Sequence, residues 1–366
     1  MSDVASRSYL ATPLHARTAE LCATNTWTEE CGFTVPALYT TEHEEQDALL
    51  ARVALSDLSA RQCWTVQGPD AASFLSVATI NDVSRLEAGQ TARTLWCDDQ
   101  GYVRGEGLIA CFGKTEFEVW TAVRDFAWFA DAALGFDLKL ANVTGTRVAI
   151  GVRGPLTPQL LAAAGLSGGP TNAGDLVRPS WRPAQVALMR DASGDGLELW
   201  TQADDGVVVW DRLWRAGAGL GIAAAGAKSL DTLRIEMATP KAGADWHPAA
   251  LARAAADLCR PTDLGFAPDL SRRFNGAEAL RRTKSSNSKV LVQLTSEQPM
   301  TSGPVAMRGV AIGRVASQTW SQTRACAFAL GWLNGDAAKI GTKVDAPGAS
   351  GPVRAEVVRL AFESQP

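Results

Sequence analysis

The sequence predicts an α+β fold with a separate all-β region at its C-terminal end. A strand, a Gly-Pro pair and a helix follow one another at residues 63–77 and again at 147–164, which indicates an internal duplication. Beyond residue 288, short alternating segments separated by glycines are typical of a small β-barrel or jelly roll. With 366 residues, 46% of them hydrophobic, the chain can bury the cores of two or three domains.

The first part of the chain predicts a helix followed by strands. At 42–55, apolar residues stand among charges at helical spacing, which indicates an amphipathic helix packed on the body. The first duplicated unit then has its strand at 63–66 and its helix at 71–77. At 98–111, an Asp-Asp-Gln-Gly turn precedes an alternating segment, so we expect a hairpin.

The rest of the chain repeats this pattern before it changes character. The second unit has its strand at 147–152 and its helix at 157–164, and two more helices are predicted at 210–217 and 230–237. The polar run at 283–288 indicates a domain boundary. We therefore expect a first domain at 1–282, whose second half begins at about 145, and a C-terminal barrel domain at 288–366.

Composition excludes several classes of protein. A net charge of -4 and a pI of about 5.6 provide no basic field for a phosphate backbone, so no nucleic-acid partner is expected. No long uncharged apolar run and no cleavable leader are evident, which predicts a cytoplasmic protein without a membrane segment. The seven cysteines are scattered and only three histidines are present, so no metal site is predicted. The chain is expected to be a monomer or a homodimer.

Several stretches, in their order along the chain, resemble the aminomethyltransferase family. This family includes the T-protein of the glycine cleavage system and tetrahydrofolate-dependent demethylases. The matching stretches are TPLHARTAEL, ALSDLSARQCWTVQGPDAASFL, TINDVSRLEAGQ, GYVRGEGLIA, GDGLELW, LDTLRIEMATPKAGADW and TDLGFAPDLSRRFNGAEALRR. The resemblance implies a T-protein-like fold, with duplicated α/β substructures around a central folate cavity and a C-terminal β-barrel.

Glu106 is the candidate catalytic residue. The resemblance aligns it with the second acid of the family's hairpin, which faces the pterin and the transferred group. Gly105 and Gly107 flank it, and their lack of side chains would let a flat ligand approach the strand. The residue type alone favours the alternative that Glu106 is a solvated strand residue, and the resemblance favours a ligand-facing acid.

The resemblance also implies residues that bind tetrahydrofolate as the cofactor. Glu198 would accept two parallel N–H bonds from the pterin edge. Arg234, Tyr102 and Phe266, which lie in matching stretches, would contribute further folate contacts. The alternative for Arg234 is a structural ion pair with Glu236.

The predicted function is a tetrahydrofolate-dependent methyl or one-carbon transferase that acts as a demethylase on a small O-, N- or S-methyl donor. The alternatives are a glycine cleavage aminomethyltransferase, which needs a lipoyl-protein partner, and a folate-binding accessory protein without activity. Demethylation is preferred because the family's Asp-Asp and Tyr-Thr-Gly-Glu signatures are eroded, with Gly105 at the position of the first acid of the hairpin. The arginine before the family's aspartate is replaced by Leu230, which implies that one folate contact is missing. The accessory branch is disfavoured because its cysteine motif is replaced at 273–280 by RFNGAEAL.

Overall fold

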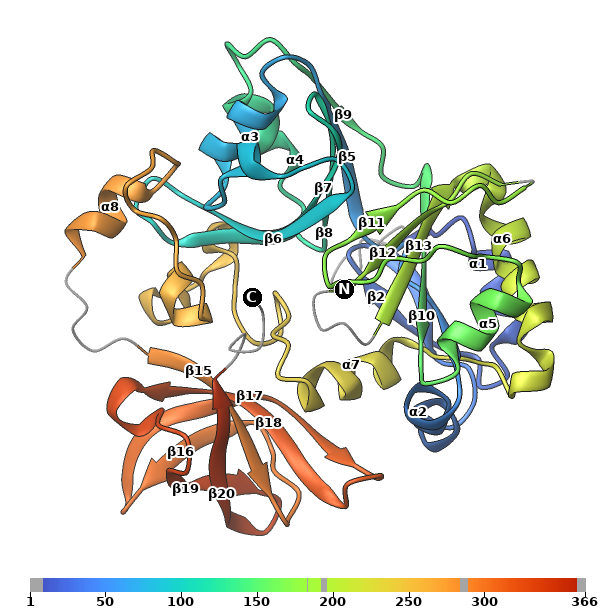
Figure 1. Ribbon diagram of the computed structural model, residues 1–366. Helices are drawn as coiled ribbons and strands as arrows, with labels where there is room; N and C mark the ends of the chain where they lie inside the picture. Colours follow the sequence, from blue (N-terminus) through green and yellow to red (C-terminus); the bar gives the residue numbers. More distant parts are fainter. Residues whose placement is uncertain (1–8, 183, 192–195, 284–288, 361–366) are drawn as a thin grey trace, which may run out of the picture.

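The computed structural model describes residues 9–182, 184–191, 196–283 and 289–360. The chain forms two sheet-containing lobes and a barrel, arranged around a common centre (Figure 1). Among the described helices, none is long and apolar enough to cross a membrane.

The first lobe is a five-stranded sheet in the order β6-β7-β8-β5-β9, covered on one face by two helices (Figure 1). Buried rings of Trp64, Trp96 and Phe129 fill the space between this face and the helices. The elements are β5 (Gln62–Gln67), α3 (Ala71–Ala78), β6 (Gln90–Cys97), β7 (Val103–Gly113), β8 (Glu116–Thr121), α4 (Phe126–Ala132) and β9 (Lys139–Asn142).

The second lobe is a six-stranded sheet in the order β11-β12-β13-β10-β4-β14. Strand β4 precedes the first lobe in the chain, so the N-terminal segment contributes to the second lobe. The elements are β4 (Ala54–Asp57), β10 (Arg147–Arg153), α5 (Thr157–Ala163), β11 (Leu176–Val177), β12 (Ala187–Arg190), β13 (Gly196–Gln202), α6 (Ala203–Ala216) and β14 (Ala223–Ala224).

The two Gly-Pro turns adopt the same unusual backbone conformation. Gly68 has φ +140° and Gly154 has φ +124°, a region that side chains disfavour. A Cβ atom on Gly68 would lie 2.6 Å from the carbonyl oxygen of Asp137, and one on Gly154 would lie 2.5 Å from that of Arg52. Both duplicated units therefore fold alike, as the sequence predicts.

The N-terminal segment forms a small sheet and two helices beside the second lobe. Helix α2 begins with a capping box, in which the Thr41 hydroxyl and the Glu44 carboxylate each bond the other's backbone N–H. It ends at Ala51, so the predicted extent to residue 55 was wrong: Leu55 belongs to β4, which pairs with β10. The elements are β1 (Leu10–Ala11), α1 (His15–Leu21), β2 (Thr26–Glu30), β3 (Phe33–Leu38) and α2 (Glu42–Ala51).

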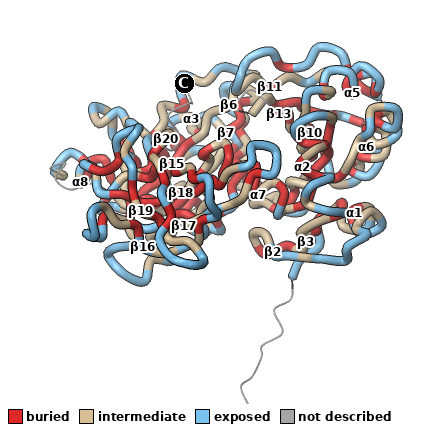
Figure 2. Tube along the Cα trace, turned by 90° about the horizontal axis from the view of Figure 1, so that it is seen from below, coloured by how far each residue is buried: buried red, intermediate tan, exposed pale blue. Residues whose placement is uncertain are grey.

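The C-terminal region is a closed antiparallel barrel in the order β15-β18-β17-β16-β19-β20, which confirms the predicted β-barrel. Its buried residues form a core inside the barrel (Figure 2). The predicted boundary at 283–288 lies mostly outside the described residues. The strands are β15 (Lys289–Ser296), β16 (Gly303–Met307), β17 (Val310–Ser321), β18 (Cys326–Asn334), β19 (Lys343–Gly348) and β20 (Gly351–Leu360).

Helix α7 (Ala227–Glu236) and the loop after it connect the lobes to the barrel (Figure 1). The Gln293 amide donates to the carbonyl oxygens of Ile235 and Glu236, at 2.6 and 2.9 Å. The indole of Trp332 donates to the carbonyl oxygen of Asp245 at 2.7 Å. The remaining elements are α8 (Ala277–Arg282) and the short 3-10 helices η1 (Val83–Arg85), η2 (Ala218–Leu220), η3 (Ala249–Leu251), η4 (Ala255–Asp257), η5 (Pro261–Leu264) and η6 (Gly335–Ala337).

Candidate functional site

Glu106 lies in the middle of β7, and only 17% of its side chain is exposed. Its Oε2 atom lies 3.2 Å from the Nη2 of Arg93, on the neighbouring strand β6. Burial raises the pKa of Glu106, and the negative charge of Asp245 raises it further. Arg93 and the backbone N–H of Ala242 lower it, but burial outweighs them, so the pKa is above its ordinary value. Glu106 is thus a mostly buried acid rather than a solvated strand residue, and its catalytic role stays a prediction.

The glycines beside Glu106 serve a purpose that differs from the predicted one. A Cβ atom on Gly105 would lie 2.3 Å from Cζ2 of Trp96. One on Gly107 would lie 2.9 Å from the carbonyl oxygen of Trp120 and 3.2 Å from Cζ3 of Trp96. Successive residues of a strand point to opposite faces, so this indole lies on the face away from Glu106. The glycines make room for a buried tryptophan, and the proposed approach of a ligand over them was wrong.

Asp245 is a buried acid that the sequence prediction missed. Its side chain is fully buried, and its Oδ2 accepts from the Nη1 of Arg234 at 2.5 Å and from the backbone N–H of Lys241 at 2.8 Å. Its Oδ1 has no hydrogen-bond partner within the described part of the chain. Buried acceptors are normally satisfied, so an unpartnered Oδ1 is unusual, although protein atoms cover it in this structure.

Arg234 joins three parts of the structure. Besides Asp245, its guanidinium donates to Asp231 at 2.6 Å, to the carbonyl oxygen of Thr239 at 3.2 Å and to the hydroxyl of Ser317 in the barrel at 3.1 Å. The predicted alternative partner, Glu236, is not among these acids. Arg234 therefore has an evident structural role, and its predicted folate contact is a further role that these bonds do not test.

The two predicted aromatic contacts lie near the same region. Tyr102 immediately precedes β7, and the guanidinium of Arg260 lies over its ring at 5.1 Å. Phe266 packs against a buried cluster that also contains Trp246 and Cys259. The folate contacts of Tyr102 and Phe266 stay predictions.

Glu198 lies on β13 in the second lobe, away from the contacts described for Glu106. Arg61 donates to it with both terminal nitrogens, Nη2 to Oε2 at 2.5 Å and Nη1 to Oε1 at 3.3 Å. The indole of Trp200 also donates to Oε2, at 2.8 Å. Burial raises the pKa of Glu198, but the charge and hydrogen bonds of Arg61 and the bond from Trp200 outweigh it, so the pKa is lowered.

An equivalent pair lies in the other half of the duplication. Arg147 donates to Glu118 at 3.1 Å, and the indole of Trp120 donates to the same carboxylate at 3.3 Å. The sequence carries this symmetry, because FEVWT at 117–121 matches LELWT at 197–201. Arg61 and Arg147 likewise stand seven residues before the glycines of the two Gly-Pro turns. This repeat is the signal that could have identified Arg61 as the partner of Glu198.

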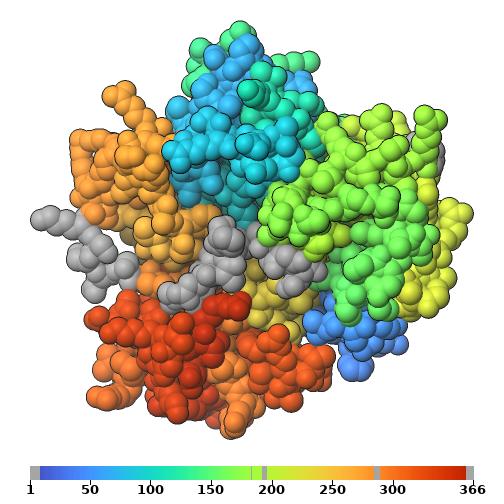
Figure 3. Space-filling view, in the orientation of Figure 1, coloured from blue at the N-terminus to red at the C-terminus, as the bar shows by residue number. Residues whose placement is uncertain are grey.

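The two lobes meet along this pair of ion pairs. Trp120 and Trp200 belong to one buried cluster with Cys63, Ala149 and Met189, which come from both sheets. The space-filling view shows the first and second lobes in contact (Figure 3). Each ion pair links a residue of one lobe to a residue of the other.

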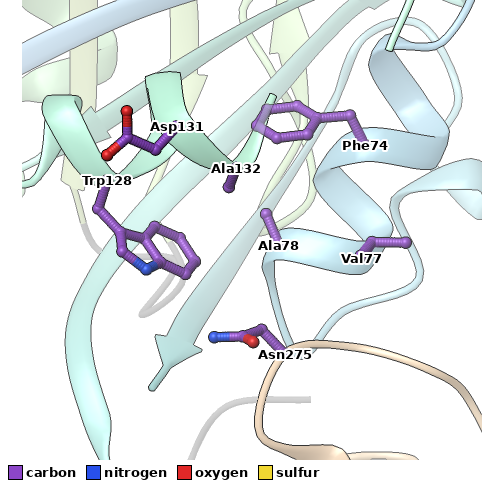
Figure 4. A pocket seen from close by; sticks show the side chains of 7 residues that line it. All are labelled: Phe74, Val77, Ala78, Trp128, Asp131, Ala132 and Asn275. Carbon is purple, nitrogen blue, oxygen red and sulfur yellow. The ribbon is translucent and has the colours of Figure 1, made fainter. Parts of the chain in front are cut away.

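One cavity lies on the helical side of the first lobe. It has a volume of about 300 Å³ and is lined by Phe74, Val77, Ala78, Trp128, Asp131, Ala132 and Asn275 (Figure 4). Most of these residues come from α3 and α4, and none is a predicted site residue. Among the described residues, no three His, Cys, Asp or Glu side chains gather into a metal-binding group.

The comparisons with known proteins agree with this architecture. The GCVT N-terminal domain family matches residues 14–255, and the glycine cleavage T-protein C-terminal barrel domain family matches residues 289–362. An aminomethyltransferase of Streptomyces coelicolor is 30% identical over 350 residues, which cover 92% of this chain and 93% of that protein. One of Frankia alni is 32% identical over 333 residues, which cover 87% and 88%.

A solved structure shares the fold. The glycine cleavage system aminomethyltransferase T of Bartonella henselae superimposes with a TM-score of 0.84 at 22% identity, covering 98% of this chain and 99% of that one. This confirms the predicted T-protein-like α+β fold. The chain therefore belongs to the aminomethyltransferase family, which includes the glycine cleavage T-proteins.

Proposed function

We propose that the chain transfers a one-carbon group to tetrahydrofolate, and that this carbon is the methylene of a thiol-bound aminomethyl group, whose nitrogen leaves as ammonia and whose sulfur leaves as the free thiol. The named relatives that cover most of the chain are aminomethyltransferases, which supports this reaction over the demethylation that the sequence alone favoured. The structural observation that carries the proposal is the carboxylate of Glu198, whose two oxygens accept two N–H bonds from the planar guanidinium of Arg61. The 2-amino and N3–H groups of a pterin form an edge of the same shape.

The residues around Glu106 suit the second part of a folate site. Reduced folate, when bound, supplies a nucleophilic N5. The raised pKa of Glu106 lets this carboxyl group keep a proton to a higher pH than an exposed glutamate, so it can donate a hydrogen bond at Oε or hold a departing proton. Positioning and proton control are the contributions expected from the chain.

Demethylation of a small molecule remains the second candidate. It is favoured by two departures from the family pattern: Leu230 replaces an arginine, and Gly105 replaces the first acid of the hairpin. Both changes alter the site without removing Glu106 or Glu198. A different donor would be compatible with the same folate contacts.

The binding step is tested by calorimetric titration with tetrahydrofolate. Glu198→Gln should weaken binding at least about tenfold, because an amide cannot accept two N–H donors with charge assistance. Glu118→Gln is the matched control, since Glu118 has the equivalent arginine and tryptophan partners and a similar exposure, 12% against 14%. Equal affinities in the wild type and both variants would remove Glu198 from the folate site.

The reaction is tested by mass spectrometry of the folate product. Formation of methylene-tetrahydrofolate from a thiol-bound aminomethyl donor would support the proposal, and formation of 5-methyl-tetrahydrofolate from a methyl donor would support demethylation. Binding of folate without turnover of any donor would leave the accessory-protein alternative. Glu106→Ala should lower turnover at least about tenfold at saturating folate, as expected for a group that acts mainly in the transition state.

A further inference from the structure

Arg61 holds Glu198 in a geometry that leaves little room for another donor. Its two terminal nitrogens bond both carboxylate oxygens, while its Nε donates to the carbonyl oxygen of Leu58 at 2.9 Å. The indole of Trp200 takes a further position on Oε2. A carboxylate has about four lone-pair positions. Described groups therefore use three of them, and the position that no described group uses is on Oε1.

The equivalent arginine in the other half is arranged differently. Arg147 bonds Glu118 only through its Nε, because its Nη1 donates to the side chain of Gln202 at 2.5 Å. The residue equivalent to Gln202 is Ala122, opposite Arg61 by the β5–β8 register, and it has no acceptor in its side chain. The duplication is therefore unsymmetrical here. Arg147 donates to both a carboxylate and an amide, whereas both terminal nitrogens of Arg61 donate to the carboxylate of Glu198.

We propose that Arg61 competes with the pterin for Glu198 and that it turns away from this carboxylate when folate binds. The proposal rests on folate binding at Glu198, as proposed above. A pterin edge needs one free lone pair on each oxygen, and with Arg61 in place only Oε1 has one. Arg61 and the pterin are thus alternative partners of a single acceptor pair.

The surroundings of Arg61 allow such a movement. The guanidinium carbon lies 5.2 Å from the ring centre of Trp120, a distance at which an indole face stabilises a cation. The Nε atom donates to the carbonyl oxygen of Leu58. Because Nε and the terminal nitrogens belong to one rigid plane, the guanidinium would leave Glu198 and the carbonyl oxygen of Leu58 together, while its contact with the indole face of Trp120 can persist.

The test compares Arg61→Met with Arg147→Met in titrations of tetrahydrofolate and of a tetrahydropterin that lacks the glutamate tail. Methionine keeps the apolar stem and removes the competing donors. Arg61→Met should bind both ligands about tenfold more tightly than the wild type, which corresponds to about 1.4 kcal/mol. Arg147→Met should stay within about twofold. The two arginines have similar exposures, 23% and 19%, so the loss of stability should be similar.

The outcomes separate this inference from the folate proposal. Unchanged or weaker binding by Arg61→Met, with a wild type that binds, would overturn the competition and leave the folate proposal intact. Binding by Arg61→Met but not by the wild type would support both. Absence of binding by every variant would overturn both. If Arg61→Met does not fold, Arg61→Lys replaces it, because lysine keeps the charge but not the planar fork, and about threefold tighter binding is expected.

Discussion

The indole ring of Trp120 stacks on that of Trp200, with ring centres 5.1 Å apart and 27° between the planes. The two residues occupy equivalent positions in FEVWT and LELWT, so the stack joins the two halves of the duplication at their contact. Both rings are nearly fully buried. The stack and the two flanking arginine–glutamate pairs form the centre of the interface between the lobes.

Loss of this stack should destabilise the protein. We expect Trp120→Ala to lower the free energy of unfolding by about 3–5 kcal/mol, because it removes a large buried ring. A double-variant cycle with Trp200→Ala, measured by chemical denaturation, should give a coupling of about 0.5–1.5 kcal/mol. Leu134→Ala, at a side chain that is 80% exposed, should change stability by less than about 0.5 kcal/mol. Strict additivity of the two tryptophan changes would contradict the energetic role of the stack.

The role of Gly105 can be separated from a role in ligand binding. Gly105→Ala should lower the free energy of unfolding by about 1–3 kcal/mol, because its methyl group would overlap the indole of Trp96. When Trp96→Leu is combined with Gly105→Ala, the total loss of unfolding free energy should be smaller than the sum of the two single losses. Gly113→Ala, on the same strand, is the control, since no atom lies within 4 Å of its added carbon. An unchanged stability of Gly105→Ala would contradict this packing role.

Glu106 should make stability depend on pH. Its raised pKa means that the folded protein binds this proton more tightly than the unfolded chain does. The resulting stabilisation is fully present at pH values below 4.5, the ordinary pKa of a glutamate, and it is lost as the pH rises through the raised pKa of the folded state. The stability of Glu106→Gln relative to the wild type should therefore rise as the pH is raised above 4.5. Denaturation curves across this range measure the trend.

Glu198→Gln provides the control of opposite sign. The pKa of Glu198 is lowered, so its stabilisation is present above 4.5 and is lost as pH falls through the lowered value. The loss of unfolding free energy in Glu198→Gln, relative to the wild type, should be largest near neutral pH and should become smaller at acidic pH. The same trend in both variants would contradict the assigned directions.

Arg234 should be a major determinant of stability. Arg234→Ala would leave Asp245, whose side chain is fully buried, without its cationic partner, and we expect a loss of about 3–5 kcal/mol in chemical denaturation. Arg354→Ala removes an arginine that is 63% exposed and paired with Asp345, and it should cost about 1 kcal/mol or less. A small loss in Arg234→Ala would show that Asp245 is satisfied by other means.

Local signals account for the elements that the sequence predicted correctly. The Gly-Pro turns at 68 and 154 and the strand and helix beside each are specified within about fifteen residues of sequence. Helix α2 was extended too far because Leu55 continues its apolar spacing, while the β4 pairing that claims Leu55 involves β10, about a hundred residues later. Pairing between distant segments overrides local periodicity in such cases.

The site was predictable only in part for the same reason. The family resemblance pointed to Glu106 and Glu198, but their partners come from other elements: Arg93 lies 13 residues from Glu106, and Arg61 lies 137 residues from Glu198. The glycines at 105 and 107 were misinterpreted because the ring that they accommodate, Trp96, lies on the neighbouring strand. Spacing alone does not reveal which side chain crosses from one strand to the next.

The attachment of the barrel sets a rule for building chimeras. The described hydrogen bonds between barrel side chains and the rest of the chain all involve residues 232–245. The barrel residues are Gln293, Ser317, Thr319, Trp332 and Arg359. The same segment contains Asp245, whose charge acts on Glu106. A barrel grafted from a relative would therefore have to bring this segment with it, and the graft would carry over part of the acid's surroundings as well.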